Sequence, residues 1–336
     1  MLEFLKDAYL PETKFPQRFI DGKLCTSCGR CFEGCPSQGF SWKKGEVPVP
    51  SRYGGLKEAC LNCRNCIAVC PAGAITIKGS YAVQKGRYKN YLTGKVIPPD
   101  PLGLKGKKSY DQFKAELSEV EHAIYTRRSN RLFKSKDIAD ERIERILEAG
   151  RFAPSSGNCQ PYQFIVLKNK RLIRELESAS LKTLRVFKNA YLIQNNKKNK
   201  PIWKNVVFSL ASYFSVTKLD QRPMTAIEKA DNSNIIYFNA PVVIIILKDT
   251  RGVSNPDLDA GICAQNMVLA AHSLGLGTCY ISLTMEPLKL LNMAGLRKKL
   301  GIKYPFKAVT SIAIGYPKGK IDGIVERDTP EVRWIR

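Results

Sequence analysis

The chain has 336 residues, 44% of them hydrophobic, which is enough for two domains with cores of their own. The longest apolar run, 240–247, is strand-sized and falls far short of the roughly 18 residues of a membrane span. Residues 1–7 lack the basic and apolar regions of a secretory signal, so we expect no membrane association and a cytoplasmic location.

The formal net charge is +24, from 54 Lys and Arg against 30 Asp and Glu. The basic residues are scattered, with small groups at 105–108 and 197–200. Three interpretations stay open: a solvated lysine-rich surface, a docking surface for an acidic electron carrier, and nucleic-acid binding. The last is the least favoured, because no helix-turn-helix, zinc-finger or RNA-binding signature is present.

Eight of the eleven cysteines form two runs of the same spacing, C-x2-C-x2-C-x3-C-P. The first run is Cys25, Cys28, Cys31 and Cys35; the second is Cys60, Cys63, Cys66 and Cys70. In such a run three thiolates bind one 4Fe–4S cluster and the fourth reaches the other cluster. The predicted metal ligands are therefore crossed: Cys25, Cys28, Cys31 and Cys70 for one cluster, and Cys60, Cys63, Cys66 and Cys35 for the other.

Zinc binding and a disulfide scaffold are weaker alternatives. Zinc sites usually use two C-x2-C pairs, and disulfide scaffolds belong to small secreted chains. Residues 17–80 resemble a bacterial-type two-cluster ferredoxin. Short extended pieces are expected after each run, near 39–43 and at 73–78.

Residues 81–117 are rich in Gly, Pro and Lys, which predicts a surface linker. A new domain begins near Ser118, which forms a capping box with Glu121 and starts a helix to about Thr126. The elements expected after it are a helix from Asp140 to Gly150, a strand at 164–167, mainly helix over 171–238, a buried strand at 241–247, a helix from Asp259 to Leu274 and a strand at 309–316.

Basic and hydroxyl side chains gather where the first of these helices ends: Arg127, Arg128, Ser129 and Arg131. The planar guanidinium fork suits phosphate oxygens, although a basic helix end that complements the helix dipole would look the same. The loop 153–161 adds small hydroxyl residues, Asn158 and Gln160, which can hydrogen-bond a planar heterocycle.

Together these two segments resemble the nitroreductase family of FMN-dependent oxidoreductases. The matching stretches are Arg127-Arg128-Ser129-x-Arg131-x-Phe133 and Ala153-Pro154-Ser155-Ser156-x-Asn158-x-Gln160-Pro161, followed in the family's order by 239–241, 264–266, 275–282 and 314–317. The resemblance spans roughly 119–330. It implies an α+β fold with a mixed central sheet flanked by helices, and a homodimer with FMN at its interface.

The resemblance also implies the cofactor-binding residues. Arg127, Arg128, Ser129, Arg131 and the late Arg327 would serve the phosphate and ribityl chain. Pro154, Ser155, Ser156 and Asn158 would meet FMN across the dimer. Backbone around Tyr280, Ile281 and Ser282 would face the flavin ring.

The predicted organisation is a two-cluster ferredoxin domain over 1–80, a linker over 81–117 and an FMN domain over 118–336. The function expected is an enzyme: the clusters relay single electrons to FMN, and a small acceptor such as a nitro compound or quinone receives two. The electron donor would be an acidic ferredoxin-like protein or NAD(P)H. The alternative is an electron-carrier or redox-sensing module that passes electrons to a protein partner.

No catalytic side chain is predicted. Cys263 and Cys279 are expected to be buried, Cys159 accessible, and His272 structural.

Overall fold

The structure is a computed structural model that divides into two compact units. One comprises Met1–Glu116, Phe187–Lys229 and Val325–Arg336; the other comprises Leu117–Val186 and Ala230–Ile324. The expected domain boundaries at residues 80 and 117 stay a prediction. The structure describes residues 13–37, 39–51, 60–79, 82–83, 92–93, 110–195, 221–289, 293–319, 324–325, 327, 330 and 332–336. Most of the predicted linker, and residues 196–220, lie outside these ranges.

The cysteine-bearing part of the first unit is built from two similar halves. Its elements are β2 (Gln17–Ile20), α2 (Arg30–Glu33), β3 (Phe40–Ser41), β4 (Val49–Pro50), α3 (Asn65–Val69) and β5 (Ile75–Lys78). β2 pairs antiparallel with β5, from Gln17 opposite Lys78 to Ile20 opposite Ile75, so these two strands join the beginning and the end of the cysteine-bearing part. β3 and β5 confirm the two short extended pieces expected after the runs. A separate sheet joins β1 (Thr13–Lys14), β6 (Ala82–Val83) and β7 (Leu92–Thr93).

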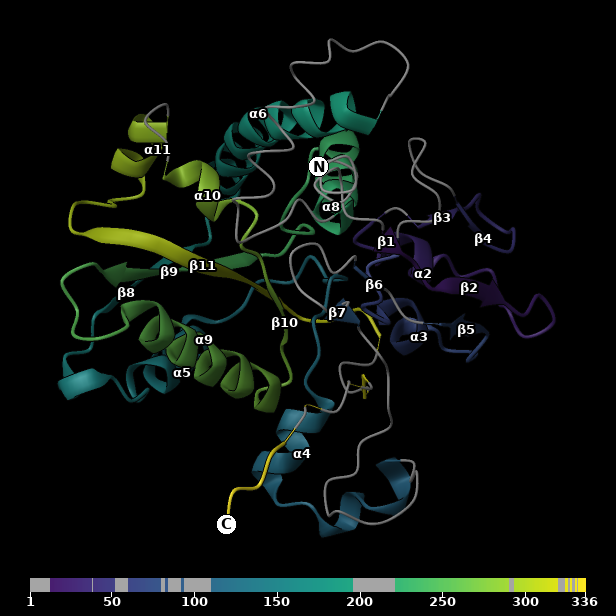
Figure 1. The fold of residues 1–336 in the computed structure, drawn as a ribbon, viewed down its shortest axis with the longest axis horizontal. Helices are drawn as coiled ribbons and strands as arrows, with labels where there is room; N and C mark the ends of the chain where they lie inside the picture. Colours follow the sequence, from purple (N-terminus) through teal and green to yellow (C-terminus); the bar gives the residue numbers. More distant parts are fainter. Residues whose placement is uncertain are drawn as a thin grey trace. The chain divides into compact units, whose positions relative to one another are not determined.

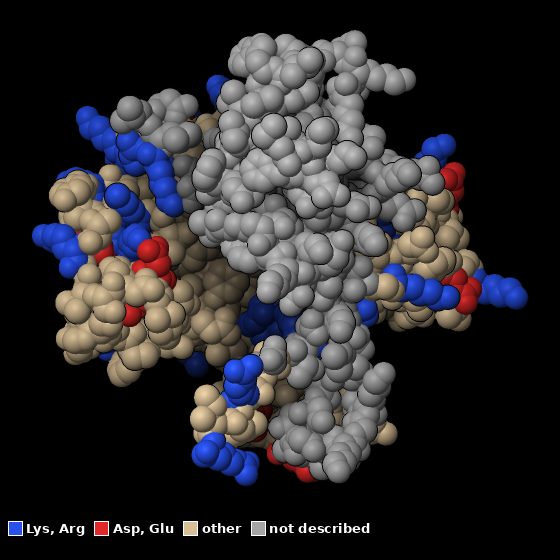
Figure 2. All heavy atoms as spheres, viewed as in Figure 1, with Lys and Arg blue, Asp and Glu red and all other residues tan. Residues whose placement is uncertain are grey.

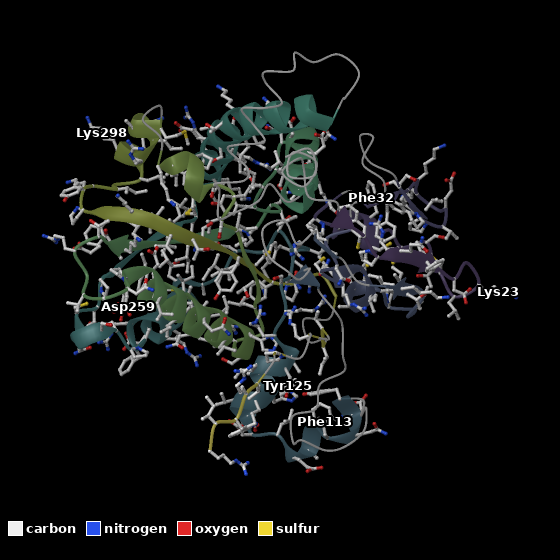
Figure 3. All side chains as sticks on the ribbon, in the orientation of Figure 1. Lys23, Phe32, Phe113, Tyr125, Asp259 and Lys298 are labelled. Carbon is white, nitrogen blue, oxygen red and sulfur yellow. The ribbon has the colours of Figure 1, made fainter. Side chains whose placement is uncertain are left out.

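Each short helix starts from a left-handed residue, Gly29 before α2 and Arg64 before α3. At Gly29 (φ +70°) a side chain is also excluded by space, because an added Cβ would lie 2.5 Å from the Trp42 ring. That ring packs against Phe32 of α2, which is labelled in Figure 3, with the two ring centroids 5.9 Å apart. The turn that begins α2 is thereby fixed by both backbone and packing.

The second unit contains a four-stranded sheet in the order β10-β11-β9-β8. Its strands are β8 (Tyr162–Leu167), β9 (Val242–Asp249), β10 (Gly277–Tyr280) and β11 (Phe306–Gly315). All three pairings are antiparallel, and a parallel bridge joins Ser129 to Thr278 at the β10 edge. The α+β class is confirmed: the three strand pairings are antiparallel, and the bridge at Ser129 is parallel. β9 is buried over its first six residues, as its continuous apolar run predicts.

The helices of the second unit are α4 (Glu119–Thr126), α5 (Asp140–Arg151), α9 (Pro256–Ser273), α10 (Met285–Leu288) and α11 (Ala294–Lys299). Two further helices, α6 (Lys170–Asn195) and α8 (Gln221–Ser233), each contain residues of both units. α9 lies along one face of the sheet with α5 beside it (Figure 1). The core between them includes Ile146, Ile244, Met267 and Ile312, each 0% exposed. Ser118 and Glu121 form the predicted capping box, with Glu121 accepting from the Ser118 amide at 2.9 Å.

Three short 3-10 turns complete the described elements: η1 (Tyr110–Gln112), η2 (Lys114–Glu116) and η3 (Ser156–Asn158). No helix in the described ranges is long and apolar enough to cross a membrane. On the face shown in Figure 2, the described Lys and Arg side chains form separate groups interspersed with Asp and Glu. This distribution gives no single basic patch on the described part of that face.

The contact of α5 with α9 gives a test of the packing. A Cβ added at Gly150 would lie 2.5 Å from Met267 Cε and 2.9 Å from its Cγ. We expect Gly150→Ala to lower the free energy of unfolding by about 1–2 kcal/mol, because overpacking outweighs the gain in helix propensity. Gly261→Ala is the matched control, since nothing lies within 4 Å of its added Cβ. It should be neutral or stabilising by up to about 1 kcal/mol in urea unfolding. Equal loss in both variants would contradict the close approach at Gly150.

Candidate functional site

Seven of the eight cysteines in the two runs fall into two groups in the structure. Burial, joined by the nearby thiols of Cys28 and Cys70, raises the pKa of the Cys31 thiol to about 11. Burial also raises the pKa of Cys66 well above its ordinary value, and there the neighbouring thiols are Cys63, Cys35 and Cys60. Cys70 therefore lies with Cys28 and Cys31 of the first run, and Cys35 lies with Cys60, Cys63 and Cys66 of the second. Crossed ligation needs these pairings.

Backbone amides approach four of these sulfurs in a repeated pattern. The amides of Ser27 and Asn62 each donate to the cysteine two positions before, Cys25 and Cys60, at 3.4 Å. The amide of Gly39 donates to Cys35 at 3.2 Å, and that of Ala74 to Cys70 at 3.3 Å. Amide donors stabilise thiolates and tune the potential of the cluster they hold.

The thiol groups are enclosed by apolar side chains. Cys31, Cys35, Cys66, Phe40 and Ile75 form one buried cluster, while Cys28 is exposed. Within the described ranges no three His, Cys, Asp or Glu side chains converge as they would on a single metal ion. A 4Fe–4S cube spaces its thiolates differently, because each binds a different iron atom.

Two cations beside this group carry no sequence signal of their own. Arg18 of β2 is 6% exposed, and its guanidinium lies over the Phe40 ring with Cζ 4.9 Å from the centroid. Lys229 of α8 donates through Nζ to the carbonyl oxygens of Glu33 and Cys35. A lone arginine in a short strand and a lysine nearly 200 positions away could be placed here only by the fold.

The basic segment after α4 is held against the edge of the sheet. The Asn130 amide donates to the Thr278 carbonyl at 2.7 Å, and Ser129 bridges Thr278. Arg128 is 5% exposed, Arg127 and Ser129 are half-buried, and Arg131 lies over the Phe238 ring at 6.0 Å. The segment is therefore part of a packed edge rather than a free helix end.

Tyr280, Ile281 and Ser282 follow along β10 at the same edge. Burial raises the pKa of Tyr280 to about 12. The positive charge of Arg127 acts in the opposite direction, so its guanidinium lies near the phenol. The Ile281 amide donates to the Ser311 carbonyl at 2.8 Å and is occupied within the protein. An amide that faces a flavin ring must then come from a neighbour of Ile281.

The loop after α5 is an ordered polar turn. The Gln160 amide donates to Ser155 Oγ at 2.9 Å, and Gln160 Nε2 donates to the Asn158 carbonyl and side-chain oxygens at 3.3 Å. Tyr162 Oη donates to the Ala153 carbonyl at 3.1 Å and pins the loop to the start of β8. Pro154 and Asn158 are exposed, and Ser155 and Ser156 half-exposed, so this face is open to a ligand.

The arginine segment at 127–131 and the loop 153–161 lie at diagonally opposite corners of the sheet. The arginine segment is at the β10 edge beside Thr278, in the register row of Ile314 and Val242. The loop precedes Tyr162 on the β8 edge, opposite Lys248. Three strand intervals and six residues along β9 separate the rows, roughly 14 Å across and roughly 20 Å along the sheet. The two segments do not come together within one chain.

The remaining predictions have mixed outcomes. Cys263 and Cys279 are 0% and 3% exposed, which confirms their burial, and Cys159 is exposed. His272 Nε2 hydrogen-bonds Thr126 Oγ1 at 2.9 Å, a structural tie between α9 and α4. Arg327 is exposed and belongs to the first unit, so its predicted part in cofactor binding stays a prediction.

Comparison with known proteins agrees with both halves of the chain. The nitroreductase family model matches residues 124–316, and a 4Fe–4S dicluster domain matches residues 24–86. An Archaeoglobus fulgidus protein described as a putative NADH dehydrogenase/NAD(P)H nitroreductase is 25% identical over 61% of this chain and 90% of its own length. An uncharacterised ferredoxin of Methanocaldococcus jannaschii is 37% identical over 21% of this chain and 90% of its own length.

Among solved structures, an FMN-bound nitroreductase from Desulfitobacterium hafniense is 22% identical. The match has a TM-score of 0.46 and covers 66% of this chain and 100% of that one. The family match extends over more than half of the 336 residues. The chain belongs to the nitroreductase family and carries a 4Fe–4S dicluster domain ahead of its nitroreductase domain.

Proposed function

We propose that this protein is an FMN- and iron–sulfur-dependent oxidoreductase that takes single electrons from a donor protein and delivers two electrons to a small organic acceptor. The observation that carries the proposal is the joining of two runs of four cysteines, matched by a 4Fe–4S dicluster domain, to a nitroreductase domain in one chain. FMN, when bound, supplies the exchange between one-electron and two-electron chemistry. Thiolate ligation also suits a reducing compartment, for which the cytoplasm is the expected place.

The thiol groups fit two 4Fe–4S clusters by their donor chemistry. Cys25, Cys28, Cys31 and Cys70 would hold one cluster, and Cys35, Cys60, Cys63 and Cys66 the other. The four amide-to-sulfur bonds orient the thiolates, and the apolar cluster around Cys31, Cys35 and Cys66 limits the access of water.

The β10 edge fits the phosphate and ribityl end of FMN. Arg127, Arg128 and Arg131 supply planar donors for phosphate oxygens, and Ser129 supplies a hydroxyl. Backbone of Tyr280 and Ser282 would face the ring, because the Ile281 amide is already bonded to Ser311. Arg327 would add a further donor to the phosphate.

A homodimer is proposed from the geometry of the sheet. The loop bearing Pro154, Ser155, Ser156 and Asn158 lies diagonally across the sheet from Arg127. One FMN can contact both segments if the loop comes from a second copy of the chain. This supports two equivalent sites at the dimer interface, each built from both subunits.

The acceptor is proposed as a class, a nitro compound or a quinone. The described residues around Tyr280 offer no carboxylic acid or histidine in a predicted catalytic role, so the proton added to the acceptor would come from water. The electron donor is proposed to be an acidic ferredoxin-like protein, attracted by the net charge of +24, with NAD(P)H as a second source.

The test uses purified holoprotein under anaerobic conditions. We expect a reduced ferredoxin to drive the consumption of a nitroaromatic or a quinone, at rates that depend on the identity of the acceptor. The Cys31→Ala/Cys35→Ala variant should lose turnover driven by ferredoxin by at least tenfold and keep any turnover driven by NADH. Rapid oxidation by a protein partner alone, with no response to either acceptor, would contradict the proposal and favour an electron-carrier module.

A further inference from the structure

Arg18 lies at a buried position of β2, where an apolar side chain is usually found. Its side chain is 6% exposed, whereas the neighbouring Phe19 is 42% exposed, so the usual alternation is inverted. Arginine is rarely buried without an anionic partner, because desolvation of its charge is costly. Among the described residues Arg18 Nε and Nη2 have no hydrogen-bond partner. A buried cation with two donors that bond no described residue implies an anionic partner other than a described side chain.

The space for this guanidinium is made by Gly39. A Cβ at Gly39 would lie 1.5 Å from Arg18 Nη1 and 2.6 Å from Cζ. The backbone of Gly39 is not left-handed, so the glycine is needed for space rather than for its conformation. The same amide donates to Cys35 Sγ at 3.2 Å. The guanidinium therefore packs directly against the backbone that holds one cluster cysteine.

The second half of the domain lacks this arrangement. The two runs are offset by 35 positions, from Cys25 to Cys60, so the counterpart of Gly39 is Ala74. The Ala74 amide makes the matching bond to Cys70 Sγ at 3.3 Å. Ala74 already carries the Cβ that Gly39 must omit, and its amide therefore donates without a guanidinium packed at that distance. Among the described residues of this domain, the buried charge belongs to one half.

The cysteines beside this charge belong to one set. The guanidinium packs against Gly39, and the Gly39 amide donates to Cys35 Sγ at 3.2 Å. Cys60 and Cys66 also lie close enough to Arg18 to interact with its charge, whereas the charged neighbours of Cys31 are Cys28 and Cys70. Arg18 thus faces the set formed by Cys35, Cys60, Cys63 and Cys66.

We propose that the anionic partner of Arg18 is the 4Fe–4S cluster held by Cys35, Cys60, Cys63 and Cys66, and that its fixed charge raises the reduction potential of that cluster alone. The inference rests on the crossed ligation of the proposed function. Reduction by the donor protein adds one electron, and so one negative charge, to the cube. A nearby cation favours the more negative form, whereas burial favours the less negative form. Arg18 offsets the burial and keeps this cluster reducible.

The test is a redox titration of the purified full-length protein, followed by electron paramagnetic resonance. We expect Arg18→Met to keep the stem packed on Phe40 and to lower one of the two midpoint potentials. At a fixed potential the reduced-to-oxidised ratio of that cluster should fall at least tenfold, which is about 59 mV for a one-electron couple. Lys78→Met is the control, because Lys78 is an exposed cation on the neighbouring strand β5. It should change both ratios by less than about twofold, as screening of exposed charges predicts.

Two further variants make the result decisive. Gly39→Ala retains the arginine but displaces its guanidinium, and should lower the same potential. Cys28→Ser changes the signal of the other cluster and so identifies which signal belongs to which set. Unchanged midpoint potentials in Arg18→Met would overturn the proposal. If Arg18→Met does not assemble its clusters, unchanged potentials in Gly39→Ala would overturn it instead. A shift in the potential of the other cluster, the one identified by Cys28→Ser, would also overturn it. Iron analysis of the wild-type protein separately tests whether two clusters are present. Failure of the proposed function can therefore be distinguished from failure of the Arg18 proposal.

Discussion

Replacing Cys31 and Cys35 together with alanine is expected to remove both iron–sulfur clusters, although both residues belong to the same run. Cys31 lies with Cys28 and Cys70, whereas Cys35 lies with Cys60 and Cys66, so each replacement takes a ligand from a different set. Iron and acid-labile sulfide per chain should fall close to zero. Loss of one thiolate leaves one iron of each cube without its protein ligand, and the buried thiols of the partial sets favour the protonated form.

The matched control removes two cysteines from one set. Cys31→Ala/Cys70→Ala takes both ligands from the same predicted cluster, so about half the iron and sulfide should remain. Uncrossed ligation gives the opposite outcome, with half the iron left in the first variant and none in the second. The two double variants remove the same number of thiols, and their comparison therefore isolates the connectivity from any general loss of stability.

Two variants that each bind FMN weakly are expected to form a tight FMN site when they are mixed and their subunits exchange. The first variant is Arg127→Ala at the β10 edge. The second is Ser156→Ala/Asn158→Gly in the loop, where glycine keeps the left-handed conformation that Asn158 adopts (φ +51°). Loss of one charge-assisted contact should weaken FMN binding roughly tenfold to 150-fold in each variant alone.

The recovery follows from a site shared between subunits. In a mixed dimer one site carries both defects, while the other combines the intact arginine of one chain with the intact loop of its partner. FMN titration by fluorescence should then show one tight site per mixed dimer. The control is the exchange of wild-type chains with a chain that carries both sets of substitutions, which should leave no intact site in a mixed dimer. No recovery in the first mixture would mean that the loop and arginines do not share a site across two chains.

The iron–sulfur part could be predicted almost completely from the order of its residues. The ligand spacing lies within runs of eleven residues, and geometry over so short a distance is set by local turns such as those at Gly29 and Arg64. The capping box at Ser118, the buried strand β9 and the helix α9 were predictable for the same reason. Helix caps and apolar periodicity depend on residues close together in the sequence, so they do not require knowledge of distant contacts.

Features that depend on contacts between distant residues could not be predicted. The order and register of β8, β9, β10 and β11 were not predicted, because register depends on which strands meet. The occupied amide of Ile281 depends on Ser311, thirty positions away on β11. The diagonal separation of Arg127 from the loop 153–160 likewise arises from the order β10-β11-β9-β8.

The sequence by itself determined the two cysteine runs, the basic segment after α4 and the polar loop after α5, because each is a short stretch whose chemistry is fixed by its own residues. Only the tertiary structure decided that the loop and the arginines stand apart in one chain, and that Arg18 is buried beside Gly39. An arginine in a strand has the same local pattern whether it faces water or the interior. Its environment is set by β5 and the turn at Gly39, which reach it only when the chain has folded.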